Sequence, residues 1–316
     1  MAGMLRQAIL LMSVGLSLLL LSGCGDERPE QIQQYQQLTE KRLTSLAQDL
    51  SNGQLRNAQL LKQYASIFAQ KHPQYSQLMD LLAKDATDQG PIFQGLQRRL
   101  ADSKVASNFI NLDAQLAEVE NLYQAADPTL YNDMLSDPVN VIADMSKGTL
   151  ARVNSISRQA DLMANNAEDF GAGSQLVGNP SYGHWQTGNN GISFWEWYGM
   201  YALFTNLASP PRYDSWSRHR GYSYYGDVGR YRYTSPKQFK KQQTVFNKTE
   251  QKFRRQGKTF NSPYAKTRTG STSLSRASQV SASTKTAKSK FRSNYSKSSN
   301  FRNSSTRTSR GIRRGK

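Results

Sequence analysis

Thiols and imidazoles are scarce in this sequence, which has one cysteine and three histidines among 316 residues. A single cysteine, Cys24, excludes a disulfide within the chain. His72, His184 and His219 lie too far apart for the ligand spacing of a zinc site, so we predict no metal site and no cofactor. The motifs G-x-S-x-G and H-E-x-x-H and a Gly-rich phosphate loop are also missing. The sequence therefore predicts that the protein is not an enzyme.

Long apolar runs are missing as well. The run from Ala8 to Leu21 has 14 residues, fewer than the ~20 that cross the hydrocarbon core of a bilayer. It follows Arg6 and precedes small residues and Cys24, which is the arrangement of an export signal. The tetrapeptide Leu21-Ser22-Gly23-Cys24 resembles the lipobox of bacterial lipoproteins. The resemblance implies that residues 1–23 are removed as a signal peptide and that Cys24 becomes a lipid-modified N-terminus.

The same resemblance implies a location. Acyl chains on Cys24 would hold the protein on a membrane, with residues 24–30 as the anchored linker. In lipoproteins of bacteria with two membranes, Asp directly after the cysteine marks retention at the inner membrane. Here Gly25 takes that position and Asp26 follows it, which implies the outer membrane, facing the periplasm. An acylated Cys24 also leaves no thiol for a metal site or a nucleophile.

Acidic residues become rare in the second half of the chain. Residues 1–170 contain 14 Lys/Arg and 19 Asp/Glu, whereas residues 171–316 contain 27 Lys/Arg and 4 Asp/Glu. From Gln251 to Lys316 there are 18 basic residues and no acidic one. This asymmetry is typical of a slightly acidic domain followed by a polycationic tail. The partner of such a tail should be an anion-rich surface.

Residues 31–170 have the apolar spacing of helices. We predict a mainly α fold, with five to seven helices packed antiparallel as an elongated bundle that folds on its own. Val153, Ile156, Ala160 and Met163 form one short stripe. The clearest stripe predicts a continuous helix, with steps of 4, 3, 4, 3 and 4 through Val105, Phe109, Leu112, Leu116, Val119 and Tyr123. Core packing is the favoured interpretation of these stripes, and a protein partner of the bundle is the alternative.

Turn-forming dipeptides mark where these helices should stop. Glycine and proline interrupt helices, and the residue before a proline avoids the helical conformation. The predicted breaks are Asn52-Gly53, His72-Pro73, Gly90-Pro91, Asp127-Pro128 and Asp137-Pro138.

At Gly171 the composition changes to Gly, Asn, Tyr and Trp, and residues 171–208 are predicted to form a small aromatic, Gly-rich α+β module. The turn signal Gly188-Asn-Asn-Gly191 lies between two aromatic-rich runs, residues 182–187 and 192–197, which predicts a β-hairpin. The alternative is a short helix through Phe194, Tyr198, Tyr201 and Phe204. Both hold if a strand gives way to a helix near Gly199.

Residues 193–207 form the most apolar segment after the signal peptide, but 15 residues that include Glu196 do not span a bilayer. We favour a local core or a cap on the bundle over an interfacial membrane element. The third interpretation is a glycan-active enzyme in which Glu196 is a general acid. Most glycosidases need a second carboxylate, and the segment contains none.

The next two segments are predicted to differ in structure. Residues 209–236 alternate Tyr with Arg, Ser and Gly and are predicted to be a flexible Tyr/Arg-rich linker. Residues 237–257 are predicted to form a basic amphipathic helix, because Phe239, Phe246 and Phe253 recur at seven-residue intervals among lysines and arginines. Such a helix suits an anionic membrane surface.

Residues 258–316 are rich in Ser, Thr, Lys and Arg and poor in large apolar residues, so we predict a disordered tail. A motif of Lys or Asn followed by Phe-Arg recurs along residues 252–302, and interleaved aromatic and cationic side chains suit single-stranded nucleic acid or anionic glycolipid. The candidate binding residues are Lys252, Phe253, Arg254, Arg255, Lys290, Phe291, Arg292, Phe301, Arg302, Arg313 and Arg314.

These features together predict a non-enzymatic lipoprotein of the cell envelope that tethers or organises. A membrane would hold the lipid on Cys24, and lipopolysaccharide, a cell-wall polymer or released DNA would bind the cationic tail. The first alternative is the peptidoglycan- or glycan-active enzyme centred on Glu196. The second is an accessory subunit or chaperone of an envelope assembly, which would hold a protein partner on the helical bundle.

Overall fold

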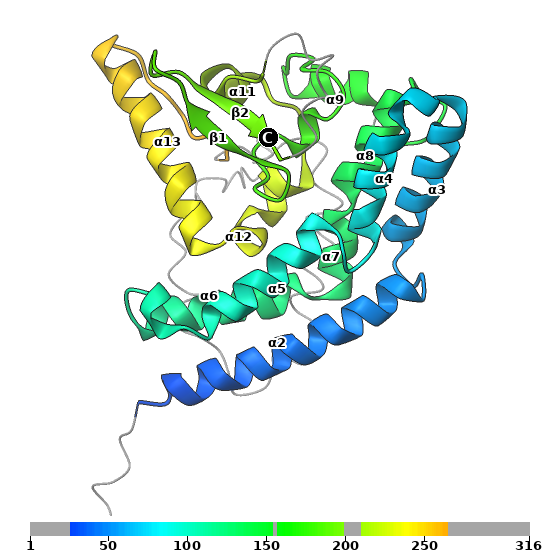
Figure 1. Cartoon of the computed structure of the whole chain (residues 1–316). Helices are drawn as coiled ribbons and strands as arrows, with labels where there is room; N and C mark the ends of the chain where they lie inside the picture. Colours follow the sequence, from blue (N-terminus) through cyan, green and yellow to red (C-terminus); the bar gives the residue numbers. More distant parts are fainter. Residues whose placement is uncertain (1–25, 154–156, 199–209, 265–316) are drawn as a thin grey trace, which may run out of the picture.

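Helices dominate the fold, as the sequence predicts. The computed structural model describes residues 26–153, 157–198 and 210–264, which form helices and one two-stranded sheet (Figure 1). The helices are α2 (Arg28–Ser51), α3 (Arg56–Lys71), α4 (Ser76–Ala83), α5 (Pro91–Ser103), α6 (Leu112–Ala125), α7 (Pro128–Met134), α8 (Ser136–Met145), α9 (Arg158–Ala164), α11 (Tyr213–His219), α12 (Arg230–Tyr233) and α13 (Pro236–Arg255). The strands are β1 (Gly183–Thr187) and β2 (Ser193–Trp197).

Four of the five predicted helix breaks are confirmed. α2 ends before Asn52-Gly53, α3 ends before His72-Pro73, and α5 and α7 begin at the prolines of the next two dipeptides. Proline suits the first helical position, where its missing N–H has no acceptor to lose. The fifth prediction is wrong, because Asp137-Pro138 lies inside the first turn of α8. N–H groups in that turn also lack helical partners, so the proline is tolerated there.

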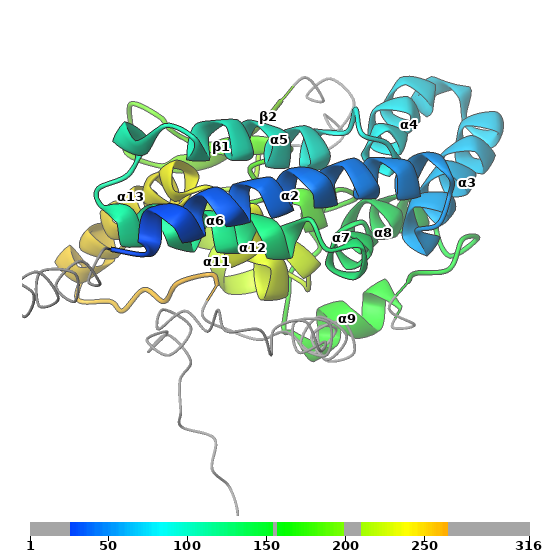
Figure 2. The same ribbon diagram turned by 90° about the horizontal axis from the view of Figure 1, so that it is seen from below.

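The long helix α2 is the base of the helical part, with α5 and α6 packed along it (Figures 1 and 2). α5 and α6 are antiparallel, since Arg99 pairs with Glu118 and Ser103 accepts a hydrogen bond from Gln115. α2 and α6 instead run in the same direction: Arg28 pairs with Asp113 near both N-termini, and Arg42 contacts Tyr123 near the other end. The prediction of uniformly antiparallel packing is therefore wrong for this pair.

The stripe at residues 105–123 is not one helix. α5 ends at Ser103, a 3-10 turn covers Ala106–Asn108, and α6 begins at Leu112. Asn111 interrupts the periodic pattern, because its side chain accepts a hydrogen bond from the N–H of Ala114 at 2.9 Å and so caps α6. Leu116 and Val119 are buried against α2, but Val105 is exposed.

The stripe predicted from Val153 to Met163 also differs. α9 begins only at Arg158, and Met163 is exposed rather than part of the core. Ile156 lies outside the described residues.

The predicted hairpin is confirmed. β1 and β2 are antiparallel, with Trp185 opposite Trp195 and His184 opposite Glu196. Gly191 has a φ of 71° in the connecting turn, a conformation that favours glycine. Gly183 is also required, because a Cβ there would lie 2.2 Å from the carbonyl oxygen of Glu196. The alternative helix extends beyond Tyr198 into positions outside the described residues.

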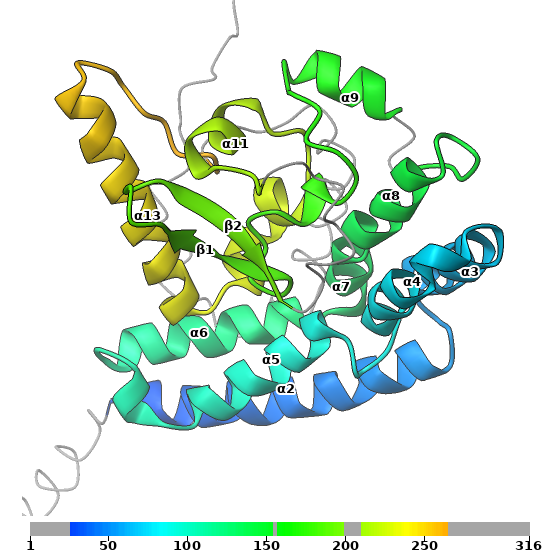
Figure 3. The same ribbon diagram turned by 45° about the horizontal axis from the view of Figure 1, so that its top comes forward.

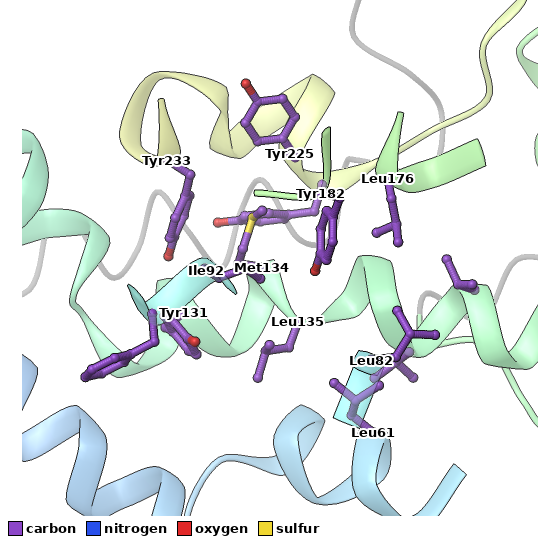
Figure 4. Close-up of a cluster of buried hydrophobic side chains, with 14 of the residues drawn as sticks. Leu61, Leu82, Ile92, Tyr131, Met134, Leu135, Leu176, Tyr182, Tyr225 and Tyr233 are labelled. Atoms are coloured by element: carbon purple, nitrogen blue, oxygen red, sulfur yellow. The ribbon is translucent and has the colours of Figure 1, made fainter. Parts of the chain in front are cut away.

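One hydrophobic core joins the helical part to everything that follows it. Tyr131 and Met134 of α7 and the adjoining Leu135 pack in the same cluster as Tyr182 and Tyr225 (Figure 4). The predicted boundary at residue 170 therefore does not separate two cores. The prediction of a flexible linker at residues 209–236 is also wrong: α11, a π-helix at Tyr225–Gly229 and α12 form there. Five of the six tyrosines and the tryptophan of this segment are buried in the core, namely Tyr213, Trp216, Tyr222, Tyr224, Tyr225 and Tyr233.

Buried charges connect the same two regions. Asp137 of α8 accepts hydrogen bonds from the N–H groups of Tyr224 and Tyr225 at 2.7 and 3.0 Å. Arg99 of α5 forms a two-point ion pair with Glu118 and donates to the carbonyl oxygen of Arg232. Breaking such a buried pair typically costs about 3–5 kcal/mol, because the remaining charge has no partner. These contacts fix the tyrosine-rich segment on the helices.

Candidate functional site

The C-terminal helix α13 covers Pro236–Arg255, where the sequence predicts a basic helix over 237–257. It begins with a capping box, in which the side chain of Ser235 accepts from the N–H of Gln238 and the Gln238 side chain accepts from the N–H of Ser235. The inner side of α13 is anchored to the core through Val245 and Gln242, whose amide donates to the Tyr225 hydroxyl at 2.8 Å. α13 lies beside β1 at the edge of the molecule (Figure 3).

Residues 258–264, which follow α13, are ordered as well, contrary to the prediction of a tail that is disordered from residue 258. Phe260 is buried, with ring centroids 4.9 Å from Phe253 and 6.0 Å from Phe246. Arg220 donates two hydrogen bonds to the carbonyl oxygen of Pro263. We call residues 258–264 the strap, because they fold back along α13 and contact Phe246 and Phe253. The stripe of phenylalanines therefore packs against the protein itself, and the membrane contact predicted for it is not available to Phe246 and Phe253.

The outer side of α13 is strongly basic. Seven side chains, all exposed, make up what we call the basic face, namely Lys237, Lys240, Lys241, Lys248, Lys252, Arg254 and Arg255. The one acid in the helix, Glu250, lies 3.5 Å from Arg254. Five of the seven, at positions 237, 241, 248, 252 and 255, lie within about 60° of one another around the helix axis at 100° per residue.

This geometry suits an extended anion. From Lys237 to Arg255 the stripe is about 27 Å long at 1.5 Å per residue. Exposed lysines act as point charges on flexible stems, so they attract phosphates and carboxylates without the fixed two-point geometry of an arginine fork. Among the described residues, no three His, Cys, Asp or Glu side chains are grouped so that they could hold a metal ion.

The predicted site residues are only partly brought together. Lys252, Arg254 and Arg255 belong to the basic face, whereas Phe253 is half-buried against the strap, which leaves only part of its ring free for a ligand. The other candidates lie outside the described residues, namely Cys24, Lys290, Phe291, Arg292, Phe301, Arg302, Arg313 and Arg314.

Glu196 lies on the outer face of the hairpin. Its carboxylate is 3.3 Å from Nε2 of His184, and both side chains are more than a third exposed. His184 also stacks on the ring of Tyr198 at 5.3 Å. Partial burial raises the pKa of the Tyr198 hydroxyl, and the Glu196 carboxylate raises it further. An exposed carboxylate paired with a histidine differs from the enclosed acid that the general-acid hypothesis assumes.

Comparison with known proteins adds no further assignment: no protein-family model, curated protein or solved structure matches the chain. Each helix that the structure describes is too short or too polar to cross a membrane.

Sequence reasoning missed one surface feature. The prediction of a single helix over residues 105–123 placed Val105 and Phe109 in a core and did not consider Ile110. In the structure, Val105 to Ile110 belong to the loop between α5 and α6, and Val105 and Ile110 are exposed. The signal that could have found it is Asn108 and Asn111, since asparagine is typical of turns and helix caps.

Proposed function

We propose that this chain is a non-enzymatic lipoprotein of the bacterial cell envelope that tethers an anionic polymer or lipid surface. Its lipid would be attached at Cys24, and its C-terminal region would bind the anion. The observation that carries this proposal is the basic face of α13: seven exposed cations, one nearby acid, and an apolar side already occupied by the core and the strap. Because their stems take no part in the core, these cations are available to a ligand.

The sequence after the strap extends the same chemistry. Residues 265–316 contain 14 Lys/Arg and no Asp/Glu, so the chain continues after the strap with a polycationic segment. Binding of this kind arises from counterion release and depends on the charge density of the partner rather than on its sequence. Lipopolysaccharide phosphates, acidic cell-wall polymers, anionic lipids and released DNA share that chemistry.

The anchor is tested separately from the anion-binding region. Cys24→Ser should abolish lipid labelling and leave the unprocessed precursor, because lipobox processing requires the thiol. Metabolic labelling with a fatty acid, together with the mass of the N-terminal peptide, measures this. A mutant that is still cut before residue 24 and still sediments with membranes would show that the chain is not a lipoprotein.

The anion-binding region is tested with an α13 of reduced positive charge. In the full chain, Lys237, Lys241, Lys248 and Lys252 are changed to Gln, and binding to duplex DNA, as a defined polyanion, is measured by anisotropy at several salt concentrations. If each lysine neutralises one phosphate, the slope of log K against log salt flattens by about 3.6. The matched control changes four exposed lysines elsewhere, namely Lys41, Lys62, Lys71 and Lys84. Equal slopes for both variants would show that α13 takes no specific part.

A further inference from the structure

The loop between α5 and α6 has an apolar tip that the fold leaves uncovered. Ile110 is 94% exposed, the largest exposed fraction of any large hydrophobic side chain among the described residues, and Val105 is 49% exposed. Phe109 between them is half-buried. The six residues from Val105 to Ile110 include no charged side chain. Such a tip can enter a less polar environment without the cost of removing a charged side chain from water.

The structure fixes this loop beside the start of α2. Arg28 and Asp113 form an ion pair at 3.0 Å, and Gln36 of α2 donates a hydrogen bond to the carbonyl oxygen of Ser103 at 2.8 Å. A small separate core, built from Ile32, Leu116 and Val119, packs the N-terminal half of α2 against α6. These contacts lie on both sides of the loop, so its position relative to Arg28 is set by folded structure.

The distance from Arg28 to the proposed anchor is short. Three residues lie between Cys24 and Arg28, and even a fully extended chain of four residue steps spans only about 14 Å. Any bilayer that held acyl chains on Cys24 would therefore lie close to the loop. The charges that flank the loop are paired, since Lys104 lies 3.4 Å from Glu40 and Asp113 lies 3.0 Å from Arg28.

From these observations we propose that the α5–α6 loop inserts Val105, Phe109 and Ile110 into the headgroup region of the anchoring membrane. The proposal rests on the lipid anchor at Cys24 proposed above. It gives the protein a defined orientation, with the N-terminal end of α2 and the loop against the bilayer. α13 lies along the same side of the molecule in all three views, so a membrane at the loop would also lie on the side of this helix (Figures 1–3).

A membrane fits this tip better than a protein partner does. A stable protein interface buries about 800 Å² on each partner, which three side chains at the end of one loop do not supply. Insertion at headgroup level needs no such area, and water there still solvates backbone groups that the loop leaves unpaired. Two of its N–H groups are already satisfied, because those of Asn108 and Phe109 donate to the carbonyl oxygens of Val105 and Ala106.

The chemistry of the single cysteine allows a direct test. If Cys24 is acylated, Ile110→Cys introduces the one free thiol in the lipidated full chain, and a maleimide fluorophore that responds to polarity can be attached there. The protein is reconstituted in vesicles of zwitterionic lipid with a fifth of anionic lipid, some carrying a headgroup-level quencher. We expect a blue-shifted emission at position 110 and strong quenching by that lipid. The matched control is Ile67→Cys, at an exposed isoleucine on α3 at the other end of α2, which should keep the emission of water (Figure 1).

Failure of the anchor and failure of the loop give different results. If the chain with its natural sequence reacts with the maleimide, Cys24 is free and the lipoprotein proposal fails. The loop is then tested in a Cys24→Ser background, where Ile110→Ser should lower partitioning into the same vesicles by about tenfold. Emission typical of water at position 110 in a lipidated, vesicle-bound protein would overturn the loop proposal. A blue shift that needs no lipid and disappears on dilution would also overturn it, because the contact would then be with a second copy of the chain.

Discussion

At the scale of single residues, the buried carboxylates Asp85 and Asp137 couple the stability of the fold to pH. Burial raises the pKa of both to about 7, against the partial compensation of their hydrogen bonds. Asp85 accepts from the Tyr182 hydroxyl at 2.7 Å and from the N–H of Ile92 at 3.3 Å. Each carboxylate therefore holds two segments of the chain together, at the cost of disfavouring its own ionisation.

The first prediction follows from the sign of this shift. The pKa of Asp85 is about 7 in the folded protein and about 4 in the unfolded chain, so the folded state binds more protons between these values. Its contribution to stability is full below about pH 4 and is lost as the pH rises through 7. Asp85→Asn removes the titration, and its amide can still accept from Ile92 and donate to Tyr182. The unfolding free energy of this variant, relative to that of the unmodified protein, should therefore increase by about 1–3 kcal/mol as the pH rises from 5 to 8.

Urea unfolding followed by circular dichroism at pH 5, 6, 7 and 8 measures this difference. The control is Asp80→Asn, which changes an exposed carboxylate on the neighbouring helix α4 and should leave the pH profile as it is. A constant difference between Asp85→Asn and the unmodified protein at every pH would contradict the prediction.

At the scale of elements, the sequence predicted what strong local signals determine. The hairpin follows from the turn at residues 188–191, and α13 follows from Ser235-Pro236 at its start and Gly257 beyond its end. The basic face of α13 could be predicted from the same residues, because exposed charge is a local property. The sequence could not predict whether Phe246 and Phe253 face a membrane or the protein. That depends on Phe260, which lies in a stretch whose composition is typical of disordered segments.

The second prediction concerns the strap. Phe260→Ala removes a buried ring that contacts Phe246 and Phe253, a type of change that costs about 3–5 kcal/mol when a core cannot collapse around it. The strap and the end of α13 should then open locally, so hydrogen exchange should accelerate there and trypsin should cut faster after Arg254, Arg255 or Lys258. The control Phe239→Ala changes a ring on the same helix that is 36% exposed and should have little effect. Unchanged exchange in Phe260→Ala would show that the strap does not depend on this ring.

At the scale of the whole molecule, the sequence predicted the helical class but not the extent of the core. Apolar periodicity detects leucine and phenylalanine stripes, and it finds none in residues 209–236, where the burial is carried by tyrosines whose hydroxyls need partners. The structure supplies one of these partners from far along the chain, because the hydroxyl of Tyr233 donates to the carbonyl oxygen of Ala125. The hydroxyl of Tyr225 bonds to Thr234 and Gln242 in the elements that follow it. Such long-range pairing leaves no local sequence signal.

The last prediction follows from the single core. A chain that stops after Phe170 keeps α2 to α9 but loses every partner that residues 171–264 provide. Asp85 then lacks the Tyr182 hydroxyl, Asp137 lacks two N–H donors, and the faces of Tyr131 and Met134 that met this segment are open to water. We expect residues 26–170 to keep helical circular dichroism, to bind a hydrophobic dye and to unfold over a broad range of urea, as expanded states with loose packing do.

The matched control is the chain that stops after Tyr264, which retains the strap and the whole core and should unfold in one sharp transition. The two chains differ only in residues 171–264, so the comparison isolates the contribution of the tyrosine-rich segment and α13. If residues 26–170 unfolded as sharply as the longer chain and bound no dye, the helical part would be an independent domain, as its periodicity alone predicts. The contacts of Asp85 and Asp137 with residues 171–264 would then be a docking interface between two domains.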